Sequence, residues 1–111
     1  MLTQLQKEVF EREGVLILEN LLSNDEIGIL NEELNRLSTL KAEEIFEAGS
    51  IMTIYRSHEA DGPTASPAYR ASAQIPRTLG IAQELLGDEL YIHNSRIYLK
   101  KAFNGLPMLW H

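Results

Sequence analysis

The sequence contains no cysteine, which excludes disulfide cross-links, zinc–thiolate sites and thiol nucleophiles. No apolar run approaches the roughly 18 residues that a membrane-spanning helix requires. Residues 1–8 also lack the basic and apolar parts of a signal peptide. We therefore expect a cytoplasmic protein with no membrane partner.

Charge is unevenly distributed along the 111 residues. Residues 1–61 contain 13 acidic and 5 basic side chains, a balance of −8, whereas residues 62–111 contain 3 acidic and 5 basic, a balance of +2. The acidic half argues against nucleic acid as a partner, because such binding depends on neutralising phosphates. The basic surplus includes Arg96, Lys100 and Lys101. Such a cluster is either a solvated strand end or a site for a small anion.

The spacing of apolar residues predicts an α+β protein. A helix over residues 3–13 stops at Gly14, and a longer helix begins at a capping box formed by Ser23 and Glu26. Two shorter helices are expected over 67–73 and 76–86, and a weakly helical stretch over 41–47. Strands are expected over 15–18, 51–56, 89–101 and 108–111. Helices come early and strands late, which is typical of the α+β class rather than of a doubly wound sheet.

The strands at the end of the sequence would leave open sheet edges, which native proteins normally cover or close. We therefore expect residues 1–111 to form a single incomplete domain that belongs to something larger. Self-association through the open strand edges is the alternative way to cover them.

The predicted strand over 89–101 alternates in polarity. Asn94, Arg96, Tyr98 and Lys100 share one face, and Ile97 and Leu99 share the other. Composition alone favours a polar face in water, whereas a binding site on this face would use the same side chains. The sequence ends in Trp110-His111. His111 is a candidate ligand for an iron site of the two-histidine, one-carboxylate type.

Several segments in order resemble the phytanoyl-CoA dioxygenase family, including its ectoine-hydroxylase-like members. The matching pieces are residues 10–23, Ile54-Tyr55 with His58, residues 85–97, and Trp110-His111. The resemblance implies the N-terminal part of a double-stranded β-helix, a jelly-roll or cupin-like barrel with flanking helices. It covers nearly the whole chain but less than half of a typical family member.

The resemblance also implies roles for individual residues. His111 falls where the family's first iron(II) ligand lies, and Asn94, Tyr98 and Lys100 fall near its 2-oxoglutarate cosubstrate. The substrate would contact a second group of residues, namely Arg96, Tyr55 and His58. The chain departs from the family at Asn94, where glutamine is frequent, and at Tyr98, where asparagine is frequent, so the details of the cosubstrate pocket differ.

Three functions are compatible with these features. The first is a fragment of an iron(II)- and 2-oxoglutarate-dependent dioxygenase that hydroxylates an unactivated carbon of a small molecule, with the 111 residues alone inactive. The second is a halogenase of the same family. The third is a non-catalytic α+β interaction module.

Overall fold

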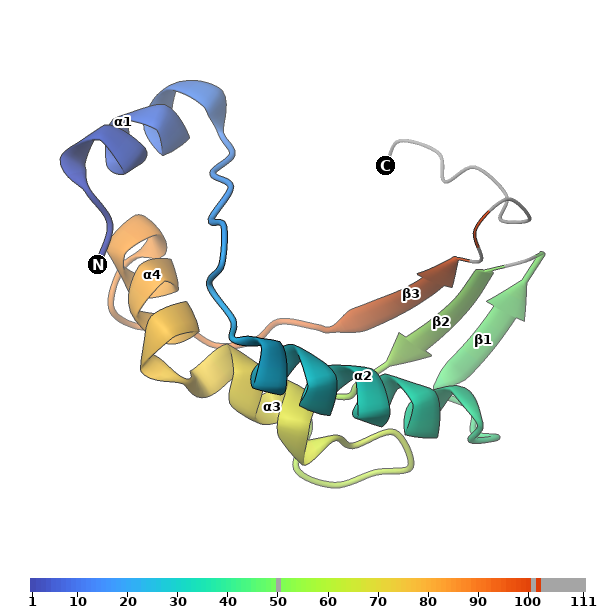
Figure 1. Cartoon of the computed structure of the whole chain (residues 1–111). Coiled ribbons are helices and arrows are strands. Elements are labelled where there is room, and N and C mark those ends of the chain that lie inside the picture. The colour runs from blue at the N-terminus through green and yellow to red at the C-terminus, as the bar shows by residue number, and fades with distance from the viewer. Residues whose placement is uncertain (50, 101, 103–111) are drawn as a thin grey trace.

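The computed structural model describes residues 1–49, 51–100 and 102 (Figure 1). Among them, four helices and three strands confirm the α+β class. In chain order these elements are α1 (Gln4–Glu13), α2 (Asn24–Ser38), β1 (Ile45–Ala48), β2 (Ile51–Tyr55), α3 (Pro67–Gln74), α4 (Pro76–Leu86) and β3 (Arg96–Lys100).

The first two helices begin at capping boxes. The Thr3 hydroxyl accepts a hydrogen bond from the Gln6 amide at 3.1 Å, and the Gln6 side chain accepts one from the Thr3 amide at 2.8 Å. Ser23 and Glu26 make the same reciprocal pair at the start of α2, at 3.2 and 2.8 Å. Gly14 then ends α1 with φ +73°, a left-handed conformation that glycine adopts without a steric penalty. Local sequence therefore determines both helix starts. The capping box at Ser23 was predicted, whereas the one at Thr3 was not.

Proline marks the start of the two later helices. Pro67 opens α3, where the Ser66 hydroxyl accepts a hydrogen bond from the Tyr69 amide at 3.3 Å. Pro76 opens α4 directly after Ile75, which has extended backbone angles and separates the two helices. A proline in the first turn sacrifices no intrahelical hydrogen bond, so both prolines suit these positions.

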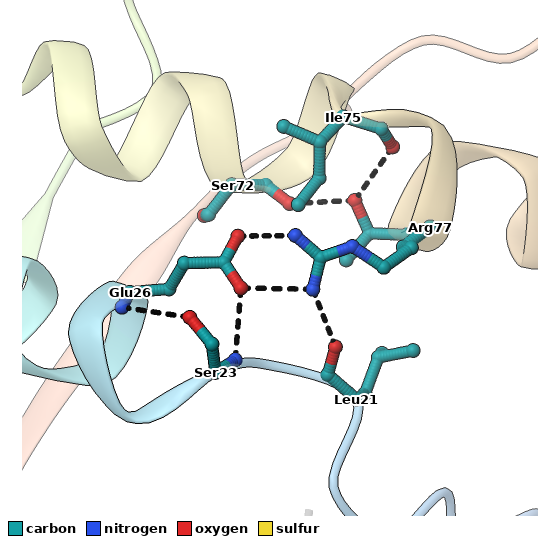
Figure 2. A network of polar contacts seen from close by, with 7 residues as sticks. Leu21, Ser23, Glu26, Ser72, Ile75 and Arg77 are labelled. Atoms are coloured by element: carbon teal, nitrogen blue, oxygen red, sulfur yellow. Dashed lines mark hydrogen bonds and ion pairs between the residues drawn. The ribbon is translucent and has the colours of Figure 1, made fainter.

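The starts of α2 and α4 are joined by a polar network (Figure 2). The Arg77 guanidinium forms a two-pronged ion pair with the Glu26 carboxylate and donates to the Leu21 carbonyl at 2.7 Å. The same carboxylate accepts the Ser23 amide in the capping box. One arginine therefore fixes α4 to the cap of α2 and to the segment before it.

The three strands form one antiparallel sheet in the order β1-β2-β3. Ile54 pairs with Ile97, while Thr53 pairs with Phe46 on one side and Tyr98 on the other. Helix α2 packs against β2, and Leu37 of α2 and Ile54 of β2 are fully buried. Within the described part of the chain, β1 and β3 are the outer strands. Self-association through those edges stays a prediction.

Two predicted elements are wrong. Residues 15–18, expected as a strand, are irregular, with Val15 58% and Ile17 80% exposed. Strand-forming side chains do not suffice without a neighbouring ladder, and no described strand pairs with this segment. Residues 41–47, expected as weakly helical, instead supply most of β1. Pairing with β2 overrides the slight helical preference there.

The long strand expected over 89–101 is shorter in the structure, because β3 begins at Arg96. Arg96 pairs with Tyr55, the last residue of β2, so residues before Arg96 have no partner on that strand. The strand expected over 108–111 lies outside the described residues. The three described strands do not by themselves make up a double-stranded β-helix. None of the described helices has both the length and the apolar character needed to cross a membrane, and the cytoplasmic location stays a prediction.

Candidate functional site

The polar face of β3 is the part of the sheet that the sequence singled out. Its residues alternate in the structure as predicted. Arg96, Tyr98 and Lys100 are exposed, whereas Ile97 and Leu99 are partly buried. Because paired residues of neighbouring strands share a face, Tyr55 and Thr53 of β2 lie on the same side as Arg96 and Tyr98. We call the surface formed by Tyr55, Arg96, Tyr98 and Lys100 the cationic strand face.

Two tyrosines hold Arg96 in place on the cationic strand face. Its guanidinium carbon lies 5.4 Å from the centre of the Tyr55 ring, within range of a cation–π contact. Its Nη1 donates to the Tyr98 hydroxyl at 3.5 Å, and this hydrogen bond raises the pKa of Arg96, with the nearby Tyr98 and Tyr55 hydroxyls adding to the effect. Arg96 therefore remains charged, and its exposed planar group can bind a carboxylate in a two-pronged way.

Lys100 and Asn94 differ in how the structure places them. Lys100 is the last residue of β3, lies opposite Ile51 and is exposed on the same face as Arg96. Asn94 is also exposed, but it lies in the irregular segment before β3. The shared strand face predicted for all four polar residues therefore begins at Arg96 and does not include Asn94.

His58 lies just beyond the end of β2 and is connected to the residue before β3. Its Nδ1 is 2.6 Å from the Ser95 hydroxyl. The backbone reinforces this link, because Arg56, with φ +67°, donates its amide to the Ser95 carbonyl at 3.3 Å. The Arg70 guanidinium donates to the His58 carbonyl at 3.5 Å. His58 is thus half-buried and held in one orientation next to the start of β3.

Sequence reasoning missed Ser95 and Arg70 as neighbours of the predicted site. Ser95 lies 37 residues from His58 and Arg70 lies 12 residues from it. No motif joins them, so only the folded chain brings them together. The one local signal was that Ser95 directly precedes Arg96.

The sequence resemblance implies two bound groups, iron(II) and 2-oxoglutarate, and the described residues suit the second better than the first. Among them, no cluster of three histidine, cysteine or acidic side chains could hold a metal ion. His111, the predicted iron(II) ligand, lies outside the described residues. The described part of the chain therefore contains no group of side chains that could hold iron on its own. A dicarboxylate such as 2-oxoglutarate fits better, since Arg96 and Lys100 offer positive charge and Tyr98 a hydroxyl on one face.

Sequence comparison finds similarity to enzymes of one class, the dioxygenases. The chain is 34% identical over 113 residues to the ectoine dioxygenase of Bordetella bronchiseptica, covering 96% of this chain and 35% of that protein. It is 32% identical over 114 residues to the ectoine dioxygenase of Stutzerimonas stutzeri, covering 94% of this chain and 35% of that protein. A third ectoine dioxygenase, from Streptomyces coelicolor, is 31% identical over 111 residues, covering 94% of this chain and 36% of that protein.

These similarities support an ectoine-hydroxylase-like relationship within the phytanoyl-CoA dioxygenase family, as the sequence motifs indicated. The chain spans about a third of the length of these relatives. They give no support to the halogenase alternative. No family model and no solved structure matches the chain.

Proposed function

We propose that this chain is part of an iron(II)- and 2-oxoglutarate-dependent dioxygenase that hydroxylates an unactivated carbon of a small molecule. The observation that carries the proposal is similarity to ectoine dioxygenases along 94–96% of the chain. Because those proteins are about three times as long, the 111 residues would form one incomplete domain, and the three strands would belong to a double-stranded β-helix.

The cosubstrate would bind at one end of the cationic strand face. Lys100 would contribute a point charge to a carboxylate of 2-oxoglutarate, and the Tyr98 hydroxyl would donate a hydrogen bond. Both side chains are exposed on the same face of β3, which supports this assignment. Asn94, exposed just before the strand, would supply a neutral hydrogen bond at the border of the site.

The small-molecule substrate would contact Arg96, Tyr55 and His58. The position of Arg96 over the Tyr55 ring supports a fixed carboxylate-binding group rather than a freely moving one. The hydrogen bond between His58 and Ser95 likewise orients the imidazole before any ligand arrives. Since the relatives are named for ectoine, ectoine is the first substrate to test.

The metal is assigned from the sequence resemblance. His111 would be one ligand of iron(II), and the other ligands would come from parts of the protein beyond the described residues. When bound, iron(II) would supply the oxygen chemistry, while the protein residues orient the substrate and the cosubstrate.

The test uses the natural protein that contains this chain, supplied with iron(II), 2-oxoglutarate and ectoine. We expect ectoine-dependent formation of succinate, measured by NMR, together with a product heavier by one oxygen atom in mass spectrometry. Lys100→Met should raise the KM for 2-oxoglutarate about tenfold or more, and Arg96→Gln should raise the KM for the substrate by a similar factor, as loss of a charge-assisted contact predicts.

Arg12→Gln is the matched control, because Arg12 is an exposed arginine of α1 whose one ion pair among the described residues is with its neighbour Glu13. It should leave both constants unchanged. Succinate formation without an oxygenated product would count against ectoine as the substrate. Absence of any 2-oxoglutarate turnover with a range of small molecules would reject the enzyme and favour the non-catalytic interaction module.

A further inference from the structure

A cleft is present outside the cationic strand face. It has a volume of ≈ 860 Å³ and is lined by residues of α3, α4, the loop after β2 and the chain that leaves α4. Its apolar lining includes Leu79, Leu86 and Leu90, and its polar lining includes His58 and Arg70. None of Arg96, Tyr98 and Lys100 lines it. Its volume is within the range of about 300–1,000 Å³ that small-molecule sites occupy.

The charge of this cleft differs from that of the rest of the molecule. The sequence has 16 acidic residues and a net charge of −6, yet no acidic residue in the described part of the chain lines the cleft. Two other cavities show the contrast. A cavity of ≈ 970 Å³ beside α1 is lined by Glu19 and Glu84, and one of ≈ 80 Å³ is lined by three carboxylates, Glu44, Glu59 and Asp61. The cleft is therefore selectively free of negative charge.

Arg70 provides the positive charge, and it has no counter-ion among the described residues. The one described hydrogen bond of its guanidinium goes to the His58 carbonyl at 3.5 Å, and the side chain is half-buried. Four of the six arginines are paired with carboxylates, namely Arg12, Arg36, Arg56 and Arg77. Arg96 instead contacts two tyrosines. Removing a guanidinium from water without a carboxylate partner is unfavourable. A ligand carboxylate would compensate this cost.

We propose that this cleft is a binding site for an amphipathic monocarboxylate, a molecule with one carboxylate and an apolar body. Arg70 binds the carboxylate, and Leu79, Leu86 and Leu90 contact the apolar body. Ser95 holds the His58 ring at the polar side of the cleft through the 2.6 Å contact. The cleft shares His58 with the substrate site proposed above, but Arg70 and the three leucines belong to the cleft alone. The inference does not depend on the proposed oxygenase activity, because it is read out as binding.

The probe for the experiment is octanoate, titrated into the natural protein that contains this chain and measured by isothermal titration calorimetry. The matched probes are octylammonium, which reverses the charge, and 1-octanol, which removes it. We expect octanoate to bind saturably and each matched probe to bind at least about tenfold more weakly, as expected for loss of a charged hydrogen bond.

Three variants test the residues. Arg70→Gln should weaken octanoate binding about tenfold or more, and Arg12→Gln should not change it. Leu86→Glu should weaken it as well, by placing a like charge in the cleft. Leu86 is 69% exposed, so Leu86→Glu should leave the fold intact. It therefore tests whether octanoate binds in the cleft even if Arg70→Gln unfolds. Circular dichroism of each variant checks the fold.

Several results would overturn the proposal. One is that the wild type and folded Arg70→Gln bind octanoate with equal affinity. Another is that the wild type binds octanoate and octylammonium equally well. The third is that the wild type shows no saturable binding of octanoate. If the cleft is instead an interface between two copies of the chain, octanoate affinity will fall as protein concentration rises. That outcome, checked by sedimentation, would also reject the small-molecule site.

Discussion

The two parts of the molecule are stabilised in different ways. The sheet region, made of α2, the three strands, α3 and the loop between β2 and α3, contains the fully buried side chains Leu37, Ile54 and Thr64. The second part, which we call the N-terminal region, consists of α1, residues 14–22 and the helix α4 that contacts them. Neither of its helices has a buried residue. Just before α1, Leu2 is the one buried apolar side chain of this part of the molecule, at 6% exposure.

Polar contacts take the place of a core in the N-terminal region. Glu84 of α4 accepts the Leu2 amide at 2.9 Å and pairs with Lys7 at 3.6 Å. Arg77 links α4 to the Leu21 carbonyl and to Glu26 (Figure 2). Exposed ion pairs contribute little to the free energy of unfolding, whereas burial of large apolar side chains contributes several kcal/mol. The sheet region should therefore dominate stability, and the N-terminal region should respond mainly to pH and salt.

The largest effect should follow from removing core volume in the sheet region. Leu37→Ala should lower the free energy of unfolding by about 2–5 kcal/mol, because the fully buried side chain leaves a cavity against the sheet. Leu5→Ala in α1 is the matched control. Its side chain is 67% exposed, so the change should stay within about 0.5 kcal/mol. Urea unfolding measures both, and similar losses for the two variants would contradict the comparison.

A smaller effect should separate two buried hydroxyls in the loop after β2. Thr64 donates to the Tyr55 carbonyl at 2.6 Å and is 1% exposed, so Thr64→Ala should cost about 1–3 kcal/mol. The Ser57 hydroxyl is buried without a hydrogen-bond partner in the described structure. Ser57→Ala should therefore be neutral within about 0.5 kcal/mol, or stabilising.

Thr64→Ser keeps the hydroxyl and is the control for this pair in the same urea experiment. It should retain most of the stability that Thr64→Ala loses. A cost for Ser57→Ala as large as that for Thr64→Ala would show that the Ser57 hydroxyl has a partner in solution.

The smallest effect concerns pH in the network of Figure 2. The Arg77 ion pair, together with the Ser23 amide and hydroxyl, lowers the pKa of Glu26 from 4.5 to about 2. A carboxyl with a depressed pKa in the folded state adds stability above its unfolded value of 4.5 and loses that contribution as pH falls towards about 2. NMR titration of the Glu26 carboxyl carbon should show this low value directly.

Arg77→Gln should raise the pKa of Glu26 towards its usual value. It should also reduce the change in the free energy of unfolding between pH 4.5 and about pH 2. Arg12→Gln should leave the Glu26 titration unchanged, because Arg12 pairs with Glu13. A Glu26 pKa that is the same with and without Arg77 would show that the capping box alone is responsible.

Features that depend on near neighbours in the sequence were predictable. The capping boxes at Thr3 and Ser23 each span four residues, and Pro67 and Pro76 impose their conformation locally. Strand pairing is non-local, so the sequence suggested a strand at 15–18 that forms no ladder and missed β1. β3 begins at Arg96 because β2 ends at its partner Tyr55, which no local pattern in residues 89–101 encodes.

The same distinction applies to the candidate site. Alternation placed Arg96, Tyr98 and Lys100 on one face, because a two-residue period is enough for that. The contact between His58 and Ser95 and the position of Arg70 depend on the path of the loop after β2 and were not predictable. Asn94 was assigned by extending the alternation past the true start of the strand.

The left-handed backbone at Arg56 restricts which sequences can encode this corner of the protein. For most residues other than glycine, this conformation costs about 1–2 kcal/mol of conformational free energy. Glycine and asparagine adopt it most readily. Valine or isoleucine would clash with its own backbone there, although both suit the strand that ends one residue earlier. Glycine would ease the backbone but lose the contact between the Arg56 guanidinium and Glu59 at 2.9 Å. The range of tolerated substitutions at position 56 is therefore set by backbone geometry first and by charge second.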